Sequence, residues 1–240
     1  MKYFLAILYC ISTINAAFAQ AKTAPPPLPP ELQALQTAYN QLTRYEMDVE
    51  YIVYKNATAS KPIQTEQTTV QRNGTSAHSR ISTVEMLITP EYALRLDHNH
   101  RRMTIAKTVA QSMEETMKVN WQQLFKLATA YMPMPAKDKN TVSYKVSIGA
   151  GAVETMEMTI DTETHLMKSC VMYYRESHTF DKSRGKNTPE QPKLVVNYKK
   201  INTNPAFTPA TFNINKFVQQ KGNTWLLTPA YKGWTLTVGK

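Results

Sequence analysis

The segment from residue 141 to residue 177 alternates apolar and polar residues with a period of two. Every second residue is apolar in 142–148 and again in 156–160, and 166–174 is apolar on both faces. Gly149-Ala150-Gly151 separates the first two runs and tolerates positive φ. This pattern is typical of half-buried strands that form an antiparallel meander. The apolar face of such a sheet must be covered, either by the protein itself or by a ligand.

The same period recurs along most of the chain. The clearest single strand is 45–53, where Tyr45, Met47 and Val49 alternate with acidic residues. Asn73-Gly74 is a strong signal for a hairpin turn. Further strands are expected at 63–72, 75–82, 86–89, 92–97, 102–108, 194–201, 211–217, 224–228 and 234–238. The sequence therefore predicts about a dozen strands.

Two segments have a helical period instead. In 31–45 the apolar residues recur at helical spacing from Leu32 to Leu42. In 112–132 an apolar stripe runs from Trp121 to Met132, and Pro133 stops it. Strands and helices do not alternate regularly, so no parallel βαβ units are expected. The predicted fold is mainly β: a single, strongly curved antiparallel sheet with two covering helices.

The N-terminus predicts export. Lys2 precedes an apolar core at 4–14, and Ala17-Phe18-Ala19 is a small-x-small cleavage signal, so residues 1–19 are expected to be a signal peptide cleaved after Ala19. Cys10 raises the alternative of a lipid anchor, but the apolar run before it is short and Tyr9 is a poor neighbour for a lipidated cysteine. A periplasmic protein without an anchor is the prediction.

A stiff linker is expected after the signal peptide. Residues 20–30 contain Pro25-Pro26-Pro27-Leu28-Pro29-Pro30, which cannot join a sheet or continue a helix. Residues 31–240 are long enough for one β-rich domain with its own core. Cys170 is the one cysteine outside the signal, so no internal disulfide is expected, and its place in a strand pattern indicates a buried core residue.

The formal charge of +10 narrows the choice of partners. Basic residues are scattered apart from short groups such as Arg101-Arg102 and Lys199-Lys200, so nucleic acid is not an expected partner of this exported chain. Attraction to an anionic membrane surface would use the excess charge. The excess also keeps a protein in solution without any partner, and the sequence leaves both interpretations open.

Signals for an enzyme are weak. The chain contains no G-x-S-x-G elbow, no H-E-x-x-H, no C-x-x-C and no phosphate-binding loop. His98 and His100 flank a polar turn beside Asp97, where two histidines are more often solvated than bound to a metal. We expect no catalytic residues, no metal and no cofactor. An envelope hydrolase that uses these histidines stays open as a hypothesis.

The apolar composition is more informative because the chain has twelve methionines, eleven of them after the signal. Several, including Met156 and Met158, lie on predicted strand faces. Methionine is flexible and polarisable, so a wall rich in methionine suits a pocket for aliphatic ligands of variable shape. Ordinary core packing is the alternative explanation.

The order of elements between residues 31 and 217 is recognisable. The segments that carry it are Leu42-Thr43-Arg44-Tyr45, Met47-Asp48-Val49-Glu50-Tyr51, Thr69-Val70-Gln71-Arg72-Asn73, Met86-Leu87-Ile88-Thr89, Tyr92-Ala93-Leu94-Arg95-Leu96-Asp97, 121–132, 159–166, Val195-Val196-Asn197-Tyr198 and Phe212. This layout resembles the LolA/LolB-like lipoprotein carriers of Gram-negative envelopes. The resemblance rests on element order more than on a strict motif.

The resemblance implies an unclosed β-barrel whose apolar cavity holds acyl chains beneath a helical lid. The implied function is a periplasmic carrier that binds lipoproteins or other lipids for delivery to the outer membrane, as a monomer, with an inner-membrane release complex and an outer-membrane acceptor as partners. Lipid-binding residues are expected at Met47, Val49, Tyr51, Val53, Leu94, Leu96, Met156, Met158 and Ile160. Lid residues are expected at Leu35, Tyr39, Arg72, Trp121, Leu124 and Phe125.

Three departures from the family pattern leave an alternative open. Asn73 stands where the family has a proline after the basic residue, which Arg72 matches. The loop 181–192 and the extension 222–240 have no counterpart in the resemblance. Because the same superfamily includes envelope sensors, a sensor or scaffold module that acts through protein contacts is the alternative function.

Overall fold

The computed structural model describes residues 25–108, 121–136, 138–178 and 189–239. The predicted signal peptide 1–19 and most of the loop 181–192 lie outside these residues, as does 20–24 of the predicted linker. Among the described residues, no helix is long and apolar enough to cross a membrane.

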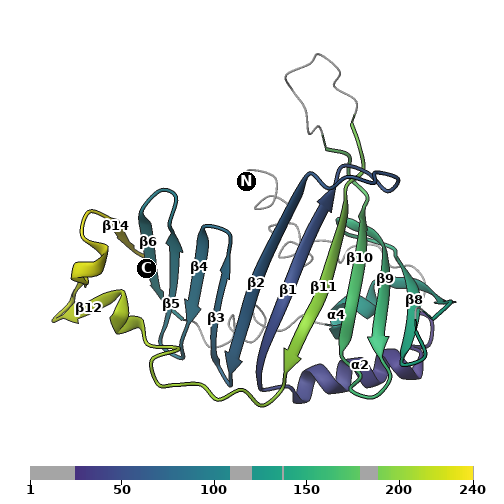
Figure 1. Ribbon diagram of the computed structural model, residues 1–240, viewed down its shortest axis with the longest axis horizontal. Helices are drawn as coiled ribbons and strands as arrows, with labels where there is room; N and C mark the ends of the chain where they lie inside the picture. Colours follow the sequence, from purple (N-terminus) through teal and green to yellow (C-terminus); the bar gives the residue numbers. More distant parts are fainter. Residues whose placement is uncertain (1–24, 109–120, 137, 179–188, 240) are drawn as a thin grey trace. The chain divides into compact units, whose positions relative to one another are not determined.

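Two α-helices and fourteen strands make up the described chain (Figure 1). The α-helices are α2 (Pro30–Gln41) and α4 (Trp121–Lys126). The strands are β1 (Arg44–Tyr54), β2 (Gln64–Asn73), β3 (Ser76–Ile81), β4 (Val84–Ile88), β5 (Tyr92–Asp97), β6 (Arg102–Lys107), β7 (Ala128–Met134), β8 (Thr141–Ile148), β9 (Val153–Asp161), β10 (Met167–Tyr174), β11 (Lys193–Asn202), β12 (Val218–Lys221), β13 (Thr224–Leu227) and β14 (Thr235–Val238). Two 3₁₀ helices, η2 (Ile214–Lys216) and η3 (Pro229–Tyr231), follow β11 and β13.

Twelve strands form one sheet in the order β14-β6-β5-β4-β3-β2-β1-β11-β10-β9-β8-β7. The predicted fold class, a mainly β chain with one large open sheet and two helices, is confirmed. The pairs β2–β3, β3–β4, β4–β5, β5–β6, β7–β8, β8–β9, β9–β10 and β10–β11 are antiparallel, whereas β14 pairs with β6 in parallel. Strands β12 and β13 form a separate hairpin. The predicted turn at Asn73-Gly74 is also present, with Gly74 at φ +59 between β2 and β3.

The second predicted helix is wrong in its C-terminal part. Only 121–126 is helical, whereas Ala128–Met134 is strand β7, paired with β8. Met132, expected at the end of the helical stripe, therefore lies in a strand and is 46% exposed. Thr129 and Tyr131 favour strand, and cross-strand pairing with β8 outweighs the helical spacing of the apolar residues. Residues 109–120 of this prediction lie outside the described chain.

The predicted strand at 211–217 is also wrong. This segment contains a turn and the 3₁₀ helix η2. The Asn213 side chain accepts a hydrogen bond from the backbone N–H of Asn215, 2.9 Å away, and so caps η2. Asparagine side chains compete in this way with the hydrogen bonds of a sheet. The apolar residues of the segment are nevertheless used, because Phe217 and Val218 are buried.

The chain divides into two compact units, which are described in turn. The first unit consists of Met1–Gln41, Glu50–Glu66 and Asn120–Tyr198. The second consists of Leu42–Val49, Gln67–Val119 and Lys199–Lys240. A single domain over 31–240 stays a prediction.

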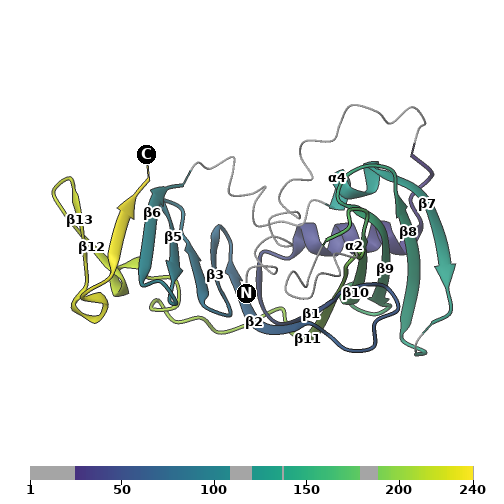
Figure 2. The same ribbon diagram turned by 90° about the horizontal axis from the view of Figure 1, so that it is seen from above.

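In the first unit, α2 lies across the strands of the sheet (Figure 1). Figure 2 shows α2 and α4 on the same side of β8, β9 and β10, with the strands curving around α2. Leu32 and Leu35 of α2 are fully buried. The spacing of three residues places both on one side of the helix, toward the sheet.

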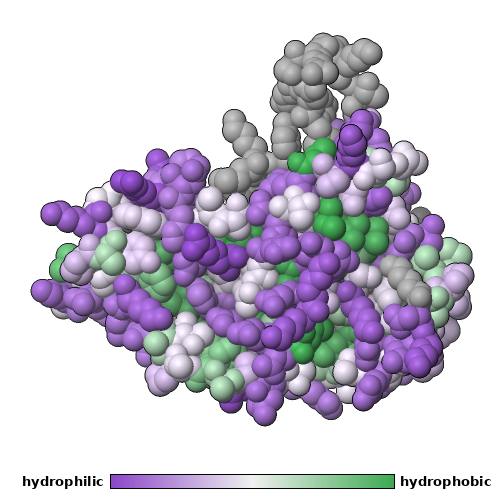
Figure 3. All heavy atoms as spheres, in the orientation of Figure 1, coloured by the Kyte–Doolittle hydropathy of each residue, from purple (hydrophilic) through white to green (hydrophobic). Residues whose placement is uncertain are grey.

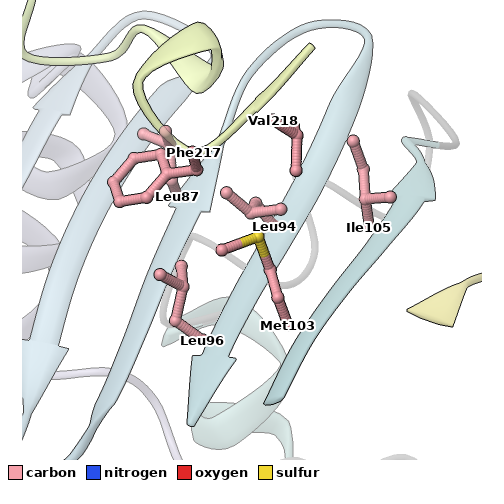
Figure 4. Close-up of a cluster of buried hydrophobic side chains, with 7 residues drawn as sticks. All are labelled: Leu87, Leu94, Leu96, Met103, Ile105, Phe217 and Val218. Atoms are coloured by element: carbon pink, nitrogen blue, oxygen red, sulfur yellow. The ribbon is translucent and has the colours of Figure 1, made fainter. Parts of the chain in front are cut away.

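In the second unit, the C-terminal segment supplies part of the core. Phe217 and Val218 lie against side chains of β4, β5 and β6 (Figure 4). The buried cluster is Leu87, Leu94, Leu96, Met103, Ile105, Phe217 and Val218. The extension that the family resemblance left unaccounted for also packs here, through Trp225, Leu227, Tyr231, Trp234 and Leu236. The extension is thus an integral part of this unit.

The turn between β9 and β10 depends on Asp161. Its Oδ1 accepts hydrogen bonds from the backbone N–H of Thr164 at 2.8 Å and of Glu163 at 3.1 Å. Lys168 Nζ lies 3.1 Å from Oδ2. The Thr164 N–H bond is the largest influence, and together with Lys168 it lowers the pKa of Asp161 to about 2. A carboxylate that accepts several such bonds is favoured in its charged form.

Asp161→Asn should lower the free energy of unfolding by about 1 to 2 kcal/mol at neutral pH, because charge-assisted hydrogen bonds are lost. The pKa is lower in the folded than in the unfolded chain, so this stabilisation is complete above about pH 4 and disappears as the pH falls toward 2. Urea denaturation from neutral to acid pH measures both effects. Glu163→Gln, in the same turn, is the control and should change the free energy of unfolding little.

Candidate functional site

Strands β8 to β11 of the first unit form a continuous apolar face by register. One row of cross-strand neighbours is Tyr144, Met158, Cys170 and Val196. The next row is Val146, Met156, Met172 and Leu194, and a third is Val142, Ile160 and Met167. Strand β7 extends the first two rows with Pro133 and Tyr131. We call these residues the covered face, because α2 lies on it.

Four methionines lie next to one another on the covered face. Met156, Met158 and Met167 are almost completely buried, and Met172 is half-buried. Met156 pairs directly with Met172 across β9 and β10. Their side chains offer an apolar surface that can change shape at little cost.

Helix α2 is tied to the covered face by one polar contact as well as by its leucines. Tyr144 Oη donates a hydrogen bond to Glu31 Oε2 at 2.7 Å. Burial, and then the bond to Glu31, raises the pKa of Tyr144 to about 12. The phenol therefore keeps its proton and its role as donor well above the ordinary tyrosine pKa of about 10.

A chain of aromatic rings connects α2 with α4 and β7. The ring centroids of Tyr39 and Trp121 are 5.5 Å apart, those of Trp121 and Phe125 5.9 Å, and those of Phe125 and Tyr131 6.3 Å. Tyr131 Oη also donates to the backbone oxygen of Phe125 at 3.2 Å. These spacings lie within the range of favourable aromatic pairs. The rings join the two helices to the edge of the covered face.

Trp121 carries a buried polar group. Its side chain is 4% exposed, and within the described chain its Nε1–H has no hydrogen-bond partner. Leaving such a donor unpaired costs about 1 to 3 kcal/mol. Most buried side-chain donors of native proteins have a hydrogen-bond partner.

Most of the predicted site residues fall in the first unit. Met156, Met158 and Ile160 lie on the covered face, and the predicted lid residues Leu35, Tyr39, Trp121, Leu124 and Phe125 lie in α2 and α4. Val53 of β1 is 1% exposed, and Tyr51 is half-buried. The structure thus places the lid residues and part of the predicted wall in one unit. Their contact with a lipid stays a prediction.

Five other predicted residues belong to the second unit. Met47 and Val49 of β1 are both 4% exposed. Leu94 and Leu96 of β5 are buried beneath Phe217 and Val218 of the protein's own C-terminal segment (Figure 4). Protein therefore covers this part of the expected wall.

Arg72 is the fifth of these residues and is used locally. Its Nε donates to the backbone oxygen of Gly74 at 3.0 Å, across the turn between β2 and β3. Burial raises the pKa of Tyr45, and the nearby Arg72 opposes that shift. Arg72 is itself only 6% exposed. Its predicted role as a lid contact is not tested by these bonds.

Sequence reasoning missed several residues of the covered face. Tyr144, Met172 and Leu194 lay in recognised strand patterns, but a single strand does not reveal which residues become cross-strand neighbours of Met156 and Met158. No local sequence pattern pointed to Glu31, because its hydrogen-bond partner Tyr144 is 113 positions away. Cys170 is buried as expected, and burial raises the pKa of its thiol to about 12. A thiol that holds its proton is a poor nucleophile.

Three of the five histidines pair with carboxylates in the second unit. His78 Nε2 lies 2.9 Å from Glu85 Oε1, and His98 Nε2 lies 2.8 Å from Oε2 of the same residue. His100 Nδ1 lies 2.9 Å from Asp97 Oδ2. Hydrogen bonding, first from His78, lowers the pKa of Glu85. Among the described residues no group of three side chains is arranged to hold a metal ion.

Comparison with known proteins finds similarity in structure only. No family model matches the chain, and no curated protein matches its sequence. The lipoprotein LppX of Mycobacterium tuberculosis matches at 11% identity and a TM-score of 0.45, covering 74% of this chain and 95% of LppX. A LolA superfamily protein of Nitrosomonas europaea matches at 10% identity and a TM-score of 0.33, covering 75% and 96%.

The MucA/MucB complex of Pseudomonas aeruginosa is also similar, at 10% identity and a TM-score of 0.39, with 82% of this chain and 63% of that chain covered. The family that the sequence resembles is therefore represented among these structures. Because identities are low and the TM-scores are all below one half, the residues of this chain alone carry the functional argument.

Tyr144→Phe should loosen α2 on the covered face, because it removes the hydrogen bond to Glu31. The loss of about 1 to 2 kcal/mol should speed hydrogen exchange of the α2 amides roughly five- to thirtyfold. Tyr173→Phe is the matched control, because it removes a tyrosine bond to Glu157 that does not involve α2. Equal exchange in the two variants would mean that the Tyr144 bond does not hold the helix.

Proposed function

We propose that the protein is a carrier that binds acyl chains of lipoproteins or other lipids on the covered face, beneath α2 and α4. The observation that carries the proposal is a methionine-rich sheet face whose cover is a helix of 12 residues with two fully buried leucines. A row across five strands is about 19 Å long at the usual strand spacing, which suits an extended acyl chain. We propose a binding role and no enzymatic one.

The energies favour exchange of the helix for a lipid. Two buried leucines hold α2 with about 3 to 6 kcal/mol. Burial of a sixteen-carbon acyl chain is worth about 12 kcal/mol. The burial energy of an entering chain therefore exceeds the energy with which the two leucines hold α2 on the covered face. When the lipid leaves, α2 can cover the face again.

The unpaired Trp121 donor adds a polar feature to the proposed ligand. An ester or amide carbonyl at the head of an acyl chain would accept a hydrogen bond from Nε1. Such a bond would end the cost of an unpaired buried donor only when cargo is bound. The ligand class that fits is thus an acylated molecule, with the carbonyl near α4.

The proposed place of action is the periplasm. The sequence predicts a cleaved signal peptide, and a lipid anchor cannot cross an aqueous compartment without apolar cover. Delivery to the outer membrane, with a release complex and an acceptor in the two membranes, is the finer part of the proposal.

A protein-contact role is the second candidate, and β7 favours it. This strand is last in the sheet order, pairs with β8 and exposes Met132. An extended segment of another protein could add to such an edge. Pro133, however, removes one backbone donor from the strand, which is a usual way of blunting an edge.

Lipid extraction distinguishes the two candidates. The protein is purified from its own envelope without detergent, and bound lipid is identified by mass spectrometry. The carrier predicts acylated molecules in near-stoichiometric amount. Protein that carries no lipid, yet captures a defined partner that a β7 variant loses, would support the sensor or scaffold role instead.

Met156→Gln should reduce lipid loading at least tenfold, because it places an amide among the apolar side chains of the covered face. Thr155→Gln is the control on the opposite face of the same strand. Met156→Leu keeps the apolar surface and should retain loading. If Met156→Gln folds normally by circular dichroism and still loads fully, the covered face is not the lipid site.

Trp121→Phe tests the polar contact by itself. The variant keeps an aromatic ring and removes the donor, so the relief of the unpaired group offsets the packing lost with the smaller ring, and the free energy of unfolding of the lipid-free protein should change little. Affinity for an acyl ester should fall about three- to tenfold, whereas affinity for an alkane chain without a carbonyl should not change. Calorimetry with both ligands makes the comparison.

A further inference from the structure

The positive charge of the chain is concentrated near its C-terminus because acidic residues end at Glu190. Residues 191–240 contain seven lysines, no arginine and no aspartate or glutamate. This segment thus contributes +7 of the formal charge of +10, and the first 190 residues contribute the remaining +3 (21 basic, 18 acidic). The lysines are spaced apart in the sequence, and the asymmetry comes from the missing acids.

Part of this basic segment is the hairpin β12–β13 of the second unit, which has two different faces. On the inner face, Val218 pairs with Leu227 and Gln220 pairs with Trp225. Val218, Leu227 and Trp225 pack on the core of the second unit. The alternate residues point the other way by register: Gln219 pairs with Leu226, and Lys221 with Thr224. Lys221 and Leu226 therefore share the outward face of the hairpin.

Apolar and basic side chains are exposed together in this segment. Leu226 is 42% exposed and Val238 is 55% exposed, two of the five most exposed large apolar side chains in the described chain. Lys216, Lys221 and Lys232 are exposed, and none of them has a carboxylate partner among the described residues. Figure 3 shows hydrophilic residues over much of the visible face, with apolar residues between them.

We propose that the exposed residues Lys216, Lys221, Leu226 and Lys232 of the C-terminal segment together form a surface that docks on a bilayer that contains anionic phospholipid. A basic surface with an exposed leucine matches the chemistry of such an interface: lysines meet lipid phosphates, and the leucine enters the boundary of the acyl region. The Gly222-Asn223 turn, with Gly222 at φ +59, places Lys221 and Thr224 at the tip of the hairpin. Docking of this kind does not depend on whether the first unit carries lipid.

Vesicle binding tests the inference. The full-length mature protein is mixed with vesicles of phosphatidylcholine alone, or of equal parts phosphatidylcholine and phosphatidylglycerol, and bound protein is measured by co-flotation. Binding should require phosphatidylglycerol and weaken with added salt. The triple variant Lys216→Gln, Lys221→Gln, Lys232→Gln should bind about a hundredfold more weakly, at about fivefold per lysine.

Matched controls separate the surface from net charge and general apolarity. Lys61→Gln, Lys126→Gln, Lys139→Gln removes the same charge from exposed positions in the first unit and should change binding far less. Leu226→Ser should weaken binding severalfold, whereas Ile63→Ser, at the same 42% exposure, should not.

Two results would overturn the proposal. If both triple variants lose binding equally, net charge alone is responsible. If the C-terminal lysines matter but Leu226→Ser binds the vesicles normally, the attraction is electrostatic alone and Leu226 does not enter the bilayer, so the proposed mode of docking is wrong. Lipid extraction from the same variants is expected to be unchanged, so failure of docking and failure of the carrier function can be told apart.

Discussion

The covered face depends on a helix that is not stable by itself. Helix α2 has 12 residues, a length at which isolated helices are marginal in water. It is helical because Leu32 and Leu35 are buried against the sheet and Glu31 accepts the hydrogen bond from Tyr144. Its order and the cover of the methionine face are therefore one equilibrium. Whatever competes for that face also acts on the helix.

The second unit meets the same need in a different way. Its strands β4 to β6 also have an apolar face, but Phe217 and Val218 cover it with covalently connected chain. The surrounding aromatic residues, among them Trp225 and Trp234, enlarge that cover. His98 contacts Trp234 edge to face and lies beside Glu85, so polar groups of the sheet also take part in holding the segment. This cover is built from buried and partly buried side chains of the C-terminal segment and not from a short helix.

The period of two along the chain was sufficient to predict the sheet, its many hairpins and the apolar faces that include Met156, Met158 and Ile160. It was not sufficient where local preference and pairing disagree: 128–134 has helical spacing but pairs with β8, and 211–217 has strand residues but is capped by Asn213. Such outcomes depend on partners far away in the sequence. The Glu31–Tyr144 bond and the burial of Leu94 under Phe217 are of the same kind. No local pattern contains them.

The side chains chosen for the two apolar faces differ in a way that bears on function. The cluster of the second unit is mostly leucine, isoleucine, valine and phenylalanine, with Met103 as its one methionine. The covered face of the first unit instead brings together Met156, Met158, Met167 and Met172. Branched side chains have few rotamers and specify one packing, whereas methionine adapts to whatever lies against it. A permanent core gains from the first property and an exchangeable surface from the second. The distribution of methionine thus distinguishes the two apolar faces. The face of the second unit is a permanent core, whereas the methionine-rich face of the first unit is covered by a short helix.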